Sequence, residues 1–182
     1  MEFRVTSSLP VVDEQTGKSP KVVVVVGNPR PGSRTAALAV ELAQAVTPII
    51  RASPPQVLDL AELIEEFGAP LGFGSATRWA DPLSTLHLAD LLIIATPTYK
   101  GSYTGILKVL LDQLPANALA GKRAVPVVTA GIAPQAAAAE SLLRQLLVEL
   151  GADVVDPGLP VVEAQLPESA AVAEKYAAGQ TW

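Results

Sequence analysis

The chain has 182 residues, of which 49% are hydrophobic and 17% are charged, and this composition is typical of one folded domain. Its formal net charge is −5 and it contains no basic run, which argues against nucleic acid or an anionic membrane as the main partner. Cysteine is absent and the single histidine is His87, so disulfides and thiolate catalysis are excluded and we expect no metal site.

The chain divides into a short extension and one domain. We expect residues 1–20 to form a polar extension and residues 21–182 to form a single domain. The extension has no apolar core of signal-peptide length. No apolar run approaches the length that spans a membrane. A cytoplasmic location is therefore expected.

The first predicted elements are a strand, a short polar loop and a helix. The valine run Val22–Val26 is typical of a strand buried on both faces at the centre of a parallel sheet. Gly27 ends this run and permits a tight turn. Beyond the loop, Leu38, Leu42 and Val46 recur every four positions, which predicts a helix.

The loop Asn28–Thr35 predicts a phosphate site. A helix N-terminus presents unpaired N–H groups and the positive end of the helix macrodipole. Amide, guanidinium and hydroxyl donors accompany it: Asn28, Arg30, Ser33, Arg34 and Thr35. Gly27 and Gly32 have the spacing of a Walker loop, but the lysine of that motif is missing, and no dinucleotide fingerprint is present. The loop suits a terminal phosphate monoester better than a pyrophosphate; the alternative is an ordinary turn with solvated arginines.

The middle of the chain contains further strand and loop signals. Gln56–Leu60 is a candidate strand, and the Gly- and Pro-rich stretch Gly68–Asp81 is a predicted loop. Arg78 and Trp79 of this loop could approach a ligand or could pack against the domain. The apolar run Leu91–Ala95 predicts a second buried strand.

The same alternation continues to the end of the chain. It predicts a helix with a stripe at Leu107–Leu114, a strand at Ala124–Thr129, a helix at Gln135–Leu150, a strand at Asp153–Asp156 and a weak helix at Glu168–Ala178. Strands that alternate with helices indicate an α/β fold with a parallel sheet and right-handed crossovers. Ligands of such folds bind beyond the carboxyl ends of the strands. The loops at these ends are Asn28–Thr35, Pro97–Gly105 and Thr129–Pro134, and together they suit a planar aromatic ligand with one phosphate.

Two of these loops carry a resemblance to a known family. Gly27–Thr35, with the sequence Gly-Asn-Pro-Arg-Pro-Gly-Ser-Arg-Thr, resembles the Gly-Ser-x-Arg-x-x-Ser phosphate loop of the NAD(P)H-dependent FMN reductases. Thr96–Lys108 resembles the Pro-x-Tyr-x-x-x-x-Ser-Gly-x-Leu-Lys flavin loop of that family, and Leu111–Pro115 continues the match. The resemblance is closest to the reductases that supply reduced FMN to alkanesulfonate-type monooxygenases. It implies a flavodoxin-like three-layer sandwich with a five-stranded parallel sheet in the order 2-1-3-4-5.

The chain departs from the family pattern at three places. Asn28 stands where serine is common, and its amide can still donate to a phosphate oxygen. Thr104 replaces the serine before Gly105 and keeps the hydroxyl. The helix at Gln135–Leu150 lacks the aromatic residue that sulfonate-system reductases can carry.

The resemblance also implies an activity and a set of site residues. The implied reaction is hydride transfer from NADPH or NADH to FMN, for which the protein supplies binding and alignment and no catalytic side chain. The implied cofactor-binding residues are Asn28, Arg30, Ser33, Arg34, Thr35, Pro97, Thr98, Tyr99, Lys100, Gly101, Thr129 and Gly131. The implied partners are a flavin-dependent monooxygenase and further copies of the chain, as a homodimer or homotetramer.

Two other functions remain open at this point. One is a reductase that retains FMN and reduces a quinone, an azo compound or a metal oxyanion. The other is a flavodoxin-like electron-transfer or binding module without NAD(P)H activity.

Overall fold

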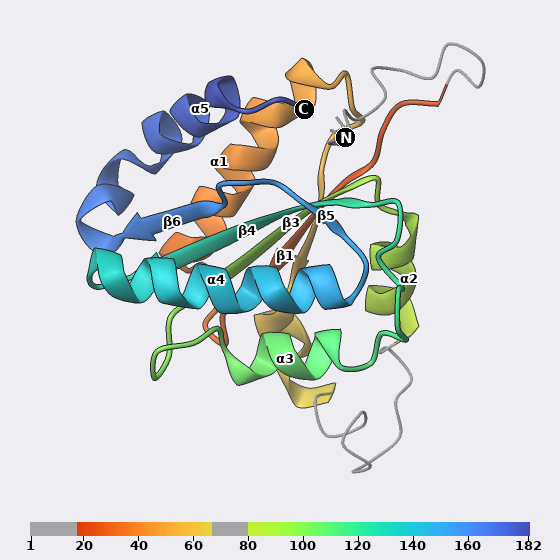
Figure 1. Ribbon diagram of the computed structural model, residues 1–182, viewed down its shortest axis with the longest axis horizontal. Helices are drawn as coiled ribbons and strands as arrows, with labels where there is room; N and C mark the ends of the chain where they lie inside the picture. Colours follow the sequence, from red (N-terminus) through yellow and green to blue (C-terminus); the bar gives the residue numbers. More distant parts are fainter. Residues whose placement is uncertain (1–17, 67–79) are drawn as a thin grey trace, which may run out of the picture.

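The computed structural model describes residues 18–66 and 80–182. The first 17 residues of the predicted extension lie outside the described residues. So does the greater part of the predicted loop Gly68–Asp81, including Arg78 and Trp79. The described residues form a central sheet with helices on both of its faces (Figure 1).

The sheet has the predicted strand order. Its strands are β1 (Val22–Val26), β2 (Gln56–Asp59), β3 (Leu91–Pro97), β4 (Arg123–Ala130), β5 (Asp153–Val154) and β6 (Leu159–Val162). The order across the sheet is β2-β1-β3-β4-β5, and the pairs that form it are all parallel. The expected 2-1-3-4-5 arrangement of a flavodoxin-like fold is therefore confirmed.

The fifth position of the sheet is divided between two short strands. β5 pairs with Arg123 and Ala124 at the start of β4, and β6 pairs with the end of β4 from Val127 onward. Pro126 lies between these two stretches of β4. Gly158 lies next to Pro126. A Cβ added to Gly158 would be 2.8 Å from the Pro126 carbonyl oxygen, so this close approach requires glycine. β6 was not expected from the sequence.

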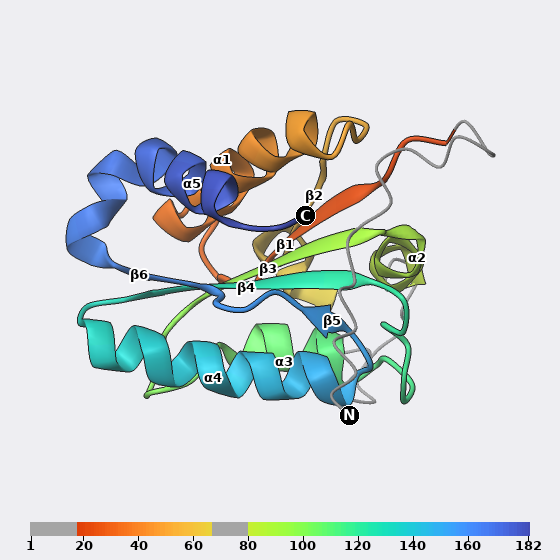
Figure 2. The ribbon, with the colours of Figure 1, turned by 45° about the horizontal axis from the view of Figure 1, so that its top comes forward.

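The helices cover the two faces of the sheet, as Figure 2 shows. One face carries α1 (Arg34–Ile49) and α5 (Ser169–Gly179), and the other carries α2 (Ala80–Leu88), α3 (Gly105–Leu111) and α4 (Ala133–Glu149). Two 3-10 helices, η1 (Leu60–Glu66) and η3 (Glu163–Glu168), follow β2 and β6. The three-layer sandwich is thus confirmed, and His87 of α2 is exposed.

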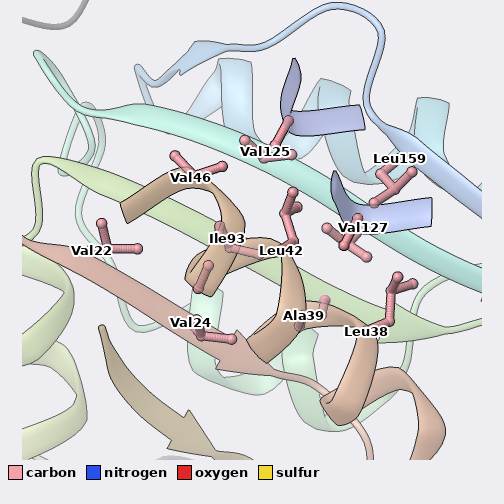
Figure 3. Close-up of a cluster of buried hydrophobic side chains, with 14 of the residues drawn as sticks. Val22, Val24, Leu38, Ala39, Leu42, Val46, Ile93, Val125, Val127 and Leu159 are labelled. Carbon is pink, nitrogen blue, oxygen red and sulfur yellow. The ribbon is translucent and has the colours of Figure 1, made fainter. Parts of the chain in front are cut away.

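The valine run of β1 supplies both halves of the core. Val22 and Val24 lie on the face of the sheet that α1 covers, in one buried cluster with Leu38 and Leu42 of that helix (Figure 3). Val23 and Val25 face the opposite layer. Every valine of the run is at most 3% exposed, and burying one such side chain stabilises the fold by about 1.5–3 kcal/mol. A strand covered on both faces is continuous in hydrophobicity, which explains the unbroken run.

Among residues 18–66 and 80–182, none of the helices combines the length and apolarity needed to cross a bilayer.

Candidate functional site

The loop after β1 is packed tightly against α3. The Gly27 N–H donates to the Ala95 carbonyl at 2.7 Å. A Cβ on Gly27 would lie 2.7 Å from the Leu107 Cβ, which is closer than carbon atoms approach, so the position requires glycine. The Thr104 hydroxyl donates to the Gly27 carbonyl and also accepts from the Leu107 N–H at the start of α3. Thr104 therefore joins the first loop to the second.

Local hydrogen bonds order the loop at the N-terminus of α1. Ser33 is the N-cap of α1, and its hydroxyl oxygen accepts from the Ala36 N–H at 3.2 Å. Asn28 is 7% exposed, and its Oδ1 accepts from the Arg30 N–H at 3.0 Å. The NH2 group of Asn28 is then the part of that side chain that remains for donation to a ligand. The first turn of α1 has no acidic residue to offset the helix dipole locally.

A buried pair of hydroxyls connects this helix to the end of β4. The Oγ1 atoms of Thr35 and Thr129 lie 2.7 Å apart, and the two residues are 3% and 4% exposed. One hydroxyl donates to the other, so the second keeps its hydrogen for another acceptor. The pair can therefore hold the loops together and still offer one donor to an anion.

The loop after β3 is a tight hairpin. Tyr99 and Ser102 exchange two backbone hydrogen bonds, of 2.9 and 3.2 Å. Between them, Lys100 has φ 53° and Gly101 has φ 82°. Two successive residues with positive φ are typical of a two-residue hairpin turn of type I′. The turn is pinned to β4 because the Thr98 N–H donates to the Thr129 carbonyl at 2.8 Å.

The loops surround a cavity of about 360 Å³, a size within the range of small-molecule sites. Of the predicted site residues, the following line it: Asn28, Arg30, Ser33, Arg34, Thr35, Pro97, Tyr99 and Thr129. The predicted residues Thr98, Lys100, Gly101 and Gly131 do not. Lys100 and Gly101 are exposed in the hairpin turn.

Thr98 and Gly131 are each within two positions of a cavity-lining residue in the sequence, but their surroundings differ. The Thr98 hydroxyl oxygen is buried and has no hydrogen-bond partner among the described residues. Gly131 is exposed, and no described atom lies within 4 Å of the position that its Cβ would take. The end of β4 is therefore open on this side.

Two lining residues lie outside the three loops predicted from the sequence. Glu163 and Leu166, both in η3, line the cavity beside the loop that follows β1. Glu163 Oε2 lies 3.0 Å from Arg34 Nη2. The contact joins residues 129 positions apart in the sequence, and η3 reaches the cavity because the unexpected strand β6 leads into it. No local pattern in the sequence signals such a contact.

The donor set suits a phosphate monoester joined to an aromatic group. Hydroxyl, amide and guanidinium donors are gathered at a helix N-terminus. The Tyr99 side chain, 41% exposed, lies at the same cavity. The described residues contain no group of His, Asp or Glu that could hold a metal ion. The arrangement can bind and orient a nucleotide-like ligand.

Known proteins match this chain in sequence. A family model described as NADPH-dependent FMN reductase matches residues 20–166. An FMN reductase (NADPH) of Pseudomonas aeruginosa is 33% identical over 159 residues, which are 85% of this chain and 83% of that protein. An FMN reductase (NADPH) of Escherichia coli is 41% identical over 81 residues, but the match spans 44% of this chain and only 42% of that protein. The NADH-dependent FMN reductase SfnF of Pseudomonas putida is 31% identical over 140 residues, covering 76% and 75%.

Solved structures match the fold. The apo form of the NADH:FMN oxidoreductase EmoB has a TM-score of 0.73 and 28% identity, and the match covers 89% of this chain and 90% of that one. An azoreductase of Bacillus anthracis has a TM-score of 0.57 at 18% identity, covering 86% and 99%, and shares the fold alone. The family match includes the loops that follow β1 and β3 and extends to Leu166 of η3. The resemblance and the class of enzyme expected from it are thereby confirmed: the chain belongs to the NADPH-dependent FMN reductase family.

Proposed function

We propose that this protein takes up FMN as a substrate, reduces it with NADPH or NADH, and releases reduced FMN to a flavin-dependent monooxygenase. The observation that carries the proposal is the cavity at the N-terminus of α1, where phosphate donors from one loop meet an exposed aromatic residue from the next. The FMN reductase names of the relatives support the reaction. The likeness of both loops to the sulfonate-system reductases supports the fate of the product.

The phosphate end of the site would be formed by the first loop. The Ser33 hydroxyl, the Asn28 amide and the Thr35–Thr129 hydroxyl pair would donate to phosphate oxygens, and Arg30 and Arg34 would add charge. The helix N-terminus strengthens each of these contacts because its dipole favours a negative charge. These residues fix one end of the ligand and thereby orient the other.

The ring end would be bordered by the hairpin after β3. Pro97, Thr98 and Tyr99 would lie along the ring, with Lys100 and Gly101 at the turn. Gly131 would leave room for the nicotinamide, because nothing described fills the space next to it. When bound, FMN supplies the hydride-accepting chemistry. The protein would align the two rings, and it needs no acid or base of its own for this transfer.

Release of reduced FMN requires modest affinity. Arg30, Arg34 and Tyr99 are all exposed at the surface, so the contacts they make are screened by solvent. A micromolar dissociation constant corresponds to about −8 kcal/mol, which a few phosphate contacts and one ring face can supply. We infer that FMN exchanges freely instead of remaining bound. We also infer that the protein works in the cytoplasm as a homodimer or homotetramer.

A second candidate is a reductase that retains FMN and acts on azo compounds, quinones or metal oxyanions. An FMN-dependent NADPH-azoreductase of Staphylococcus haemolyticus, 32% identical over 102 residues, favours this alternative. The match covers 52% of each protein. A flavodoxin-like module without NAD(P)H activity is the alternative from another class.

One experiment separates the three functions. The protein is purified without added flavin, its bound FMN is measured, and NAD(P)H oxidation is followed against free FMN concentration. Saturable dependence on free FMN supports the proposed exchange. Stoichiometric FMN that survives dialysis, with turnover only after an azo compound or a quinone is added, would favour the second candidate. FMN binding without NAD(P)H oxidation under either condition would favour the module.

A further inference from the structure

The rim of the phosphate cavity carries a carboxylate of this chain. Arg34 is the first residue of α1, and Glu163 is the first residue of η3. Their side chains meet at 3.0 Å, where they are 63% and 55% exposed. Both residues line the cavity. The guanidinium that would face a phosphate is therefore already in contact with an anion supplied by the protein.

The Glu163 carboxylate is negatively charged, like the phosphate that the rest of the cavity is suited to bind. Among the described lining residues, Arg30 and Arg34 are the cations and Glu163 is the anion. The first turn of α1 contains no acidic residue, so Glu163 is the group that offsets the positive helix end from outside the helix. A phosphate dianion in the cavity would meet repulsion from Glu163 and would share Arg34 with it.

We propose that Glu163 is a built-in counter-anion that weakens phosphate binding and thereby keeps FMN exchangeable. This inference rests on the proposed function, because it assigns a role within the same site. Glu163 acts through Arg34, so it is a positioning residue and not a catalytic one. Its effect depends on the charge of the ligand: it penalises FMN, which has a phosphate, and leaves riboflavin, which has none, unaffected.

The test is the Glu163→Gln variant, assayed by flavin binding without NAD(P)H. Flavin fluorescence quenching at low ionic strength gives dissociation constants for FMN and for riboflavin. We expect FMN to bind about three- to tenfold more tightly than to the wild type, because an exposed ion pair and a screened repulsion have effects of this order. Riboflavin affinity should not change. The gain for FMN should decline as salt is added.

A matched control variant and a double variant test whether Glu163 acts through Arg34. Glu168→Gln changes the net charge equally in the same 3-10 helix, but Glu168 does not line the phosphate cavity. FMN affinity should be unchanged in this variant. In an Arg34→Gln background, adding Glu163→Gln should give a smaller gain than in the wild type, because the carboxylate acts through that guanidinium. Inorganic phosphate should also compete with FMN at a lower concentration in Glu163→Gln than in the wild type.

The outcomes separate this inference from the proposed function. Unchanged or weaker FMN binding by Glu163→Gln overturns the counter-anion role. An equal gain for riboflavin, or an equal gain in the Glu168→Gln control, overturns it as well. If the wild type binds FMN and riboflavin equally, the phosphate site itself is wrong and both proposals fail. If the wild type prefers FMN but Glu163→Gln behaves like the wild type, only the role of Glu163 fails.

Discussion

A single residue, Gly27, determines how closely the loop after β1 approaches α3. Gly27 lies between Leu107 and Ala95, and an added Cβ would be 2.7 Å from the Leu107 Cβ and 3.2 Å from the Ala95 carbonyl oxygen. Neither neighbour is the flexible end of a long side chain. The first loop therefore lies against α3 with no room for a methyl group.

Substitution of Gly27 tests this packing. Gly27→Ala should lower the free energy of unfolding by about 1–3 kcal/mol, because overpacking forces α3 or the loop to shift. Urea denaturation monitored by circular dichroism measures the change. Gly131→Ala is the control, since no described atom lies near its Cβ position, and it should unfold like the wild type. Equal stability of the two variants would contradict the close approach.

Arg30 tests the phosphate assignment directly. Its side chain lines the cavity and is exposed, so its removal should not disturb the fold. Arg30→Ala should weaken FMN binding by roughly tenfold, which corresponds to a loss of about 1.4 kcal/mol. Riboflavin affinity should change little. Fluorescence titration measures both constants, and a parallel loss for both flavins would mean that Arg30 supports the loop and not the ligand.

Asp59 gives a prediction about pH. Burial raises the pKa of the Asp59 carboxyl above its ordinary value of 3.8, an effect that the hydrogen bond from the Ala61 N–H partly offsets. Because the pKa is higher in the folded state than in the unfolded one, ionised Asp59 destabilises the fold, and this cost disappears when the carboxyl is protonated. Asp59→Asn keeps an acceptor for Ala61. It should raise the free energy of unfolding near about pH 7 but not near about pH 3, as urea denaturation at both values would show. A gain of equal size at both pH values would exclude charge as the cause.

The start of α1 and the end of β4 are joined by a buried contact between two hydroxyls. Thr35→Val leaves the Thr129 hydroxyl without its buried partner, which should cost about 1–3 kcal/mol in unfolding free energy. Thr129→Val should cost a similar amount. The double variant should lose less than the sum, because no unpaired hydroxyl remains. Urea denaturation of the four proteins without flavin gives the coupling energy, and strict additivity would show that the hydroxyls do not interact.

The central elements were predictable because their patterns are strong. The valine run identified β1, and the apolar run at Leu91–Ala95 identified β3. β6 was missed because Pro157, Gly158 and Pro160 interrupt its surroundings, which makes the segment look like a loop. The segment becomes a strand because it pairs with β4, and the local sequence does not indicate this pairing.

The same distinction applies to the site. The donors of the first loop were predictable because one short stretch contains them and a helix follows. Glu163 was not, because its position depends on a strand that pairs at the far side of β4. Interactions of neighbouring residues can be inferred from their spacing, whereas a contact across 129 positions depends on the completed sheet.

We expect the homo-oligomer proposed above to associate through α4. Leu142 and Val148 are 42% and 57% exposed on the outer side of this helix, and apolar residues exposed in this way are common at interfaces between subunits. Leu142→Glu should shift the protein toward monomers in light scattering after size exclusion. Ile49→Glu, at the end of α1 on the other face of the sheet, is the control and should not. Unchanged mass for Leu142→Glu would exclude this surface.

Because the fifth position of the sheet is divided, the two sides of the cavity rest on strands with different numbers of hydrogen-bonded neighbours. The lining residues Pro97 and Thr129 belong to β3 and β4, each of which is hydrogen-bonded to strands on both sides. The rim at Glu163 and Leu166 follows β6, a four-residue edge strand that pairs with β4 alone. Amide protons of edge segments exchange through small local openings, whereas those of central strands require larger ones. We therefore expect the amide protons of β6 and η3 to exchange faster than those of β3 and β4 in hydrogen-exchange measurements. Such local opening would let a nucleotide enter and leave while the central sheet stays folded.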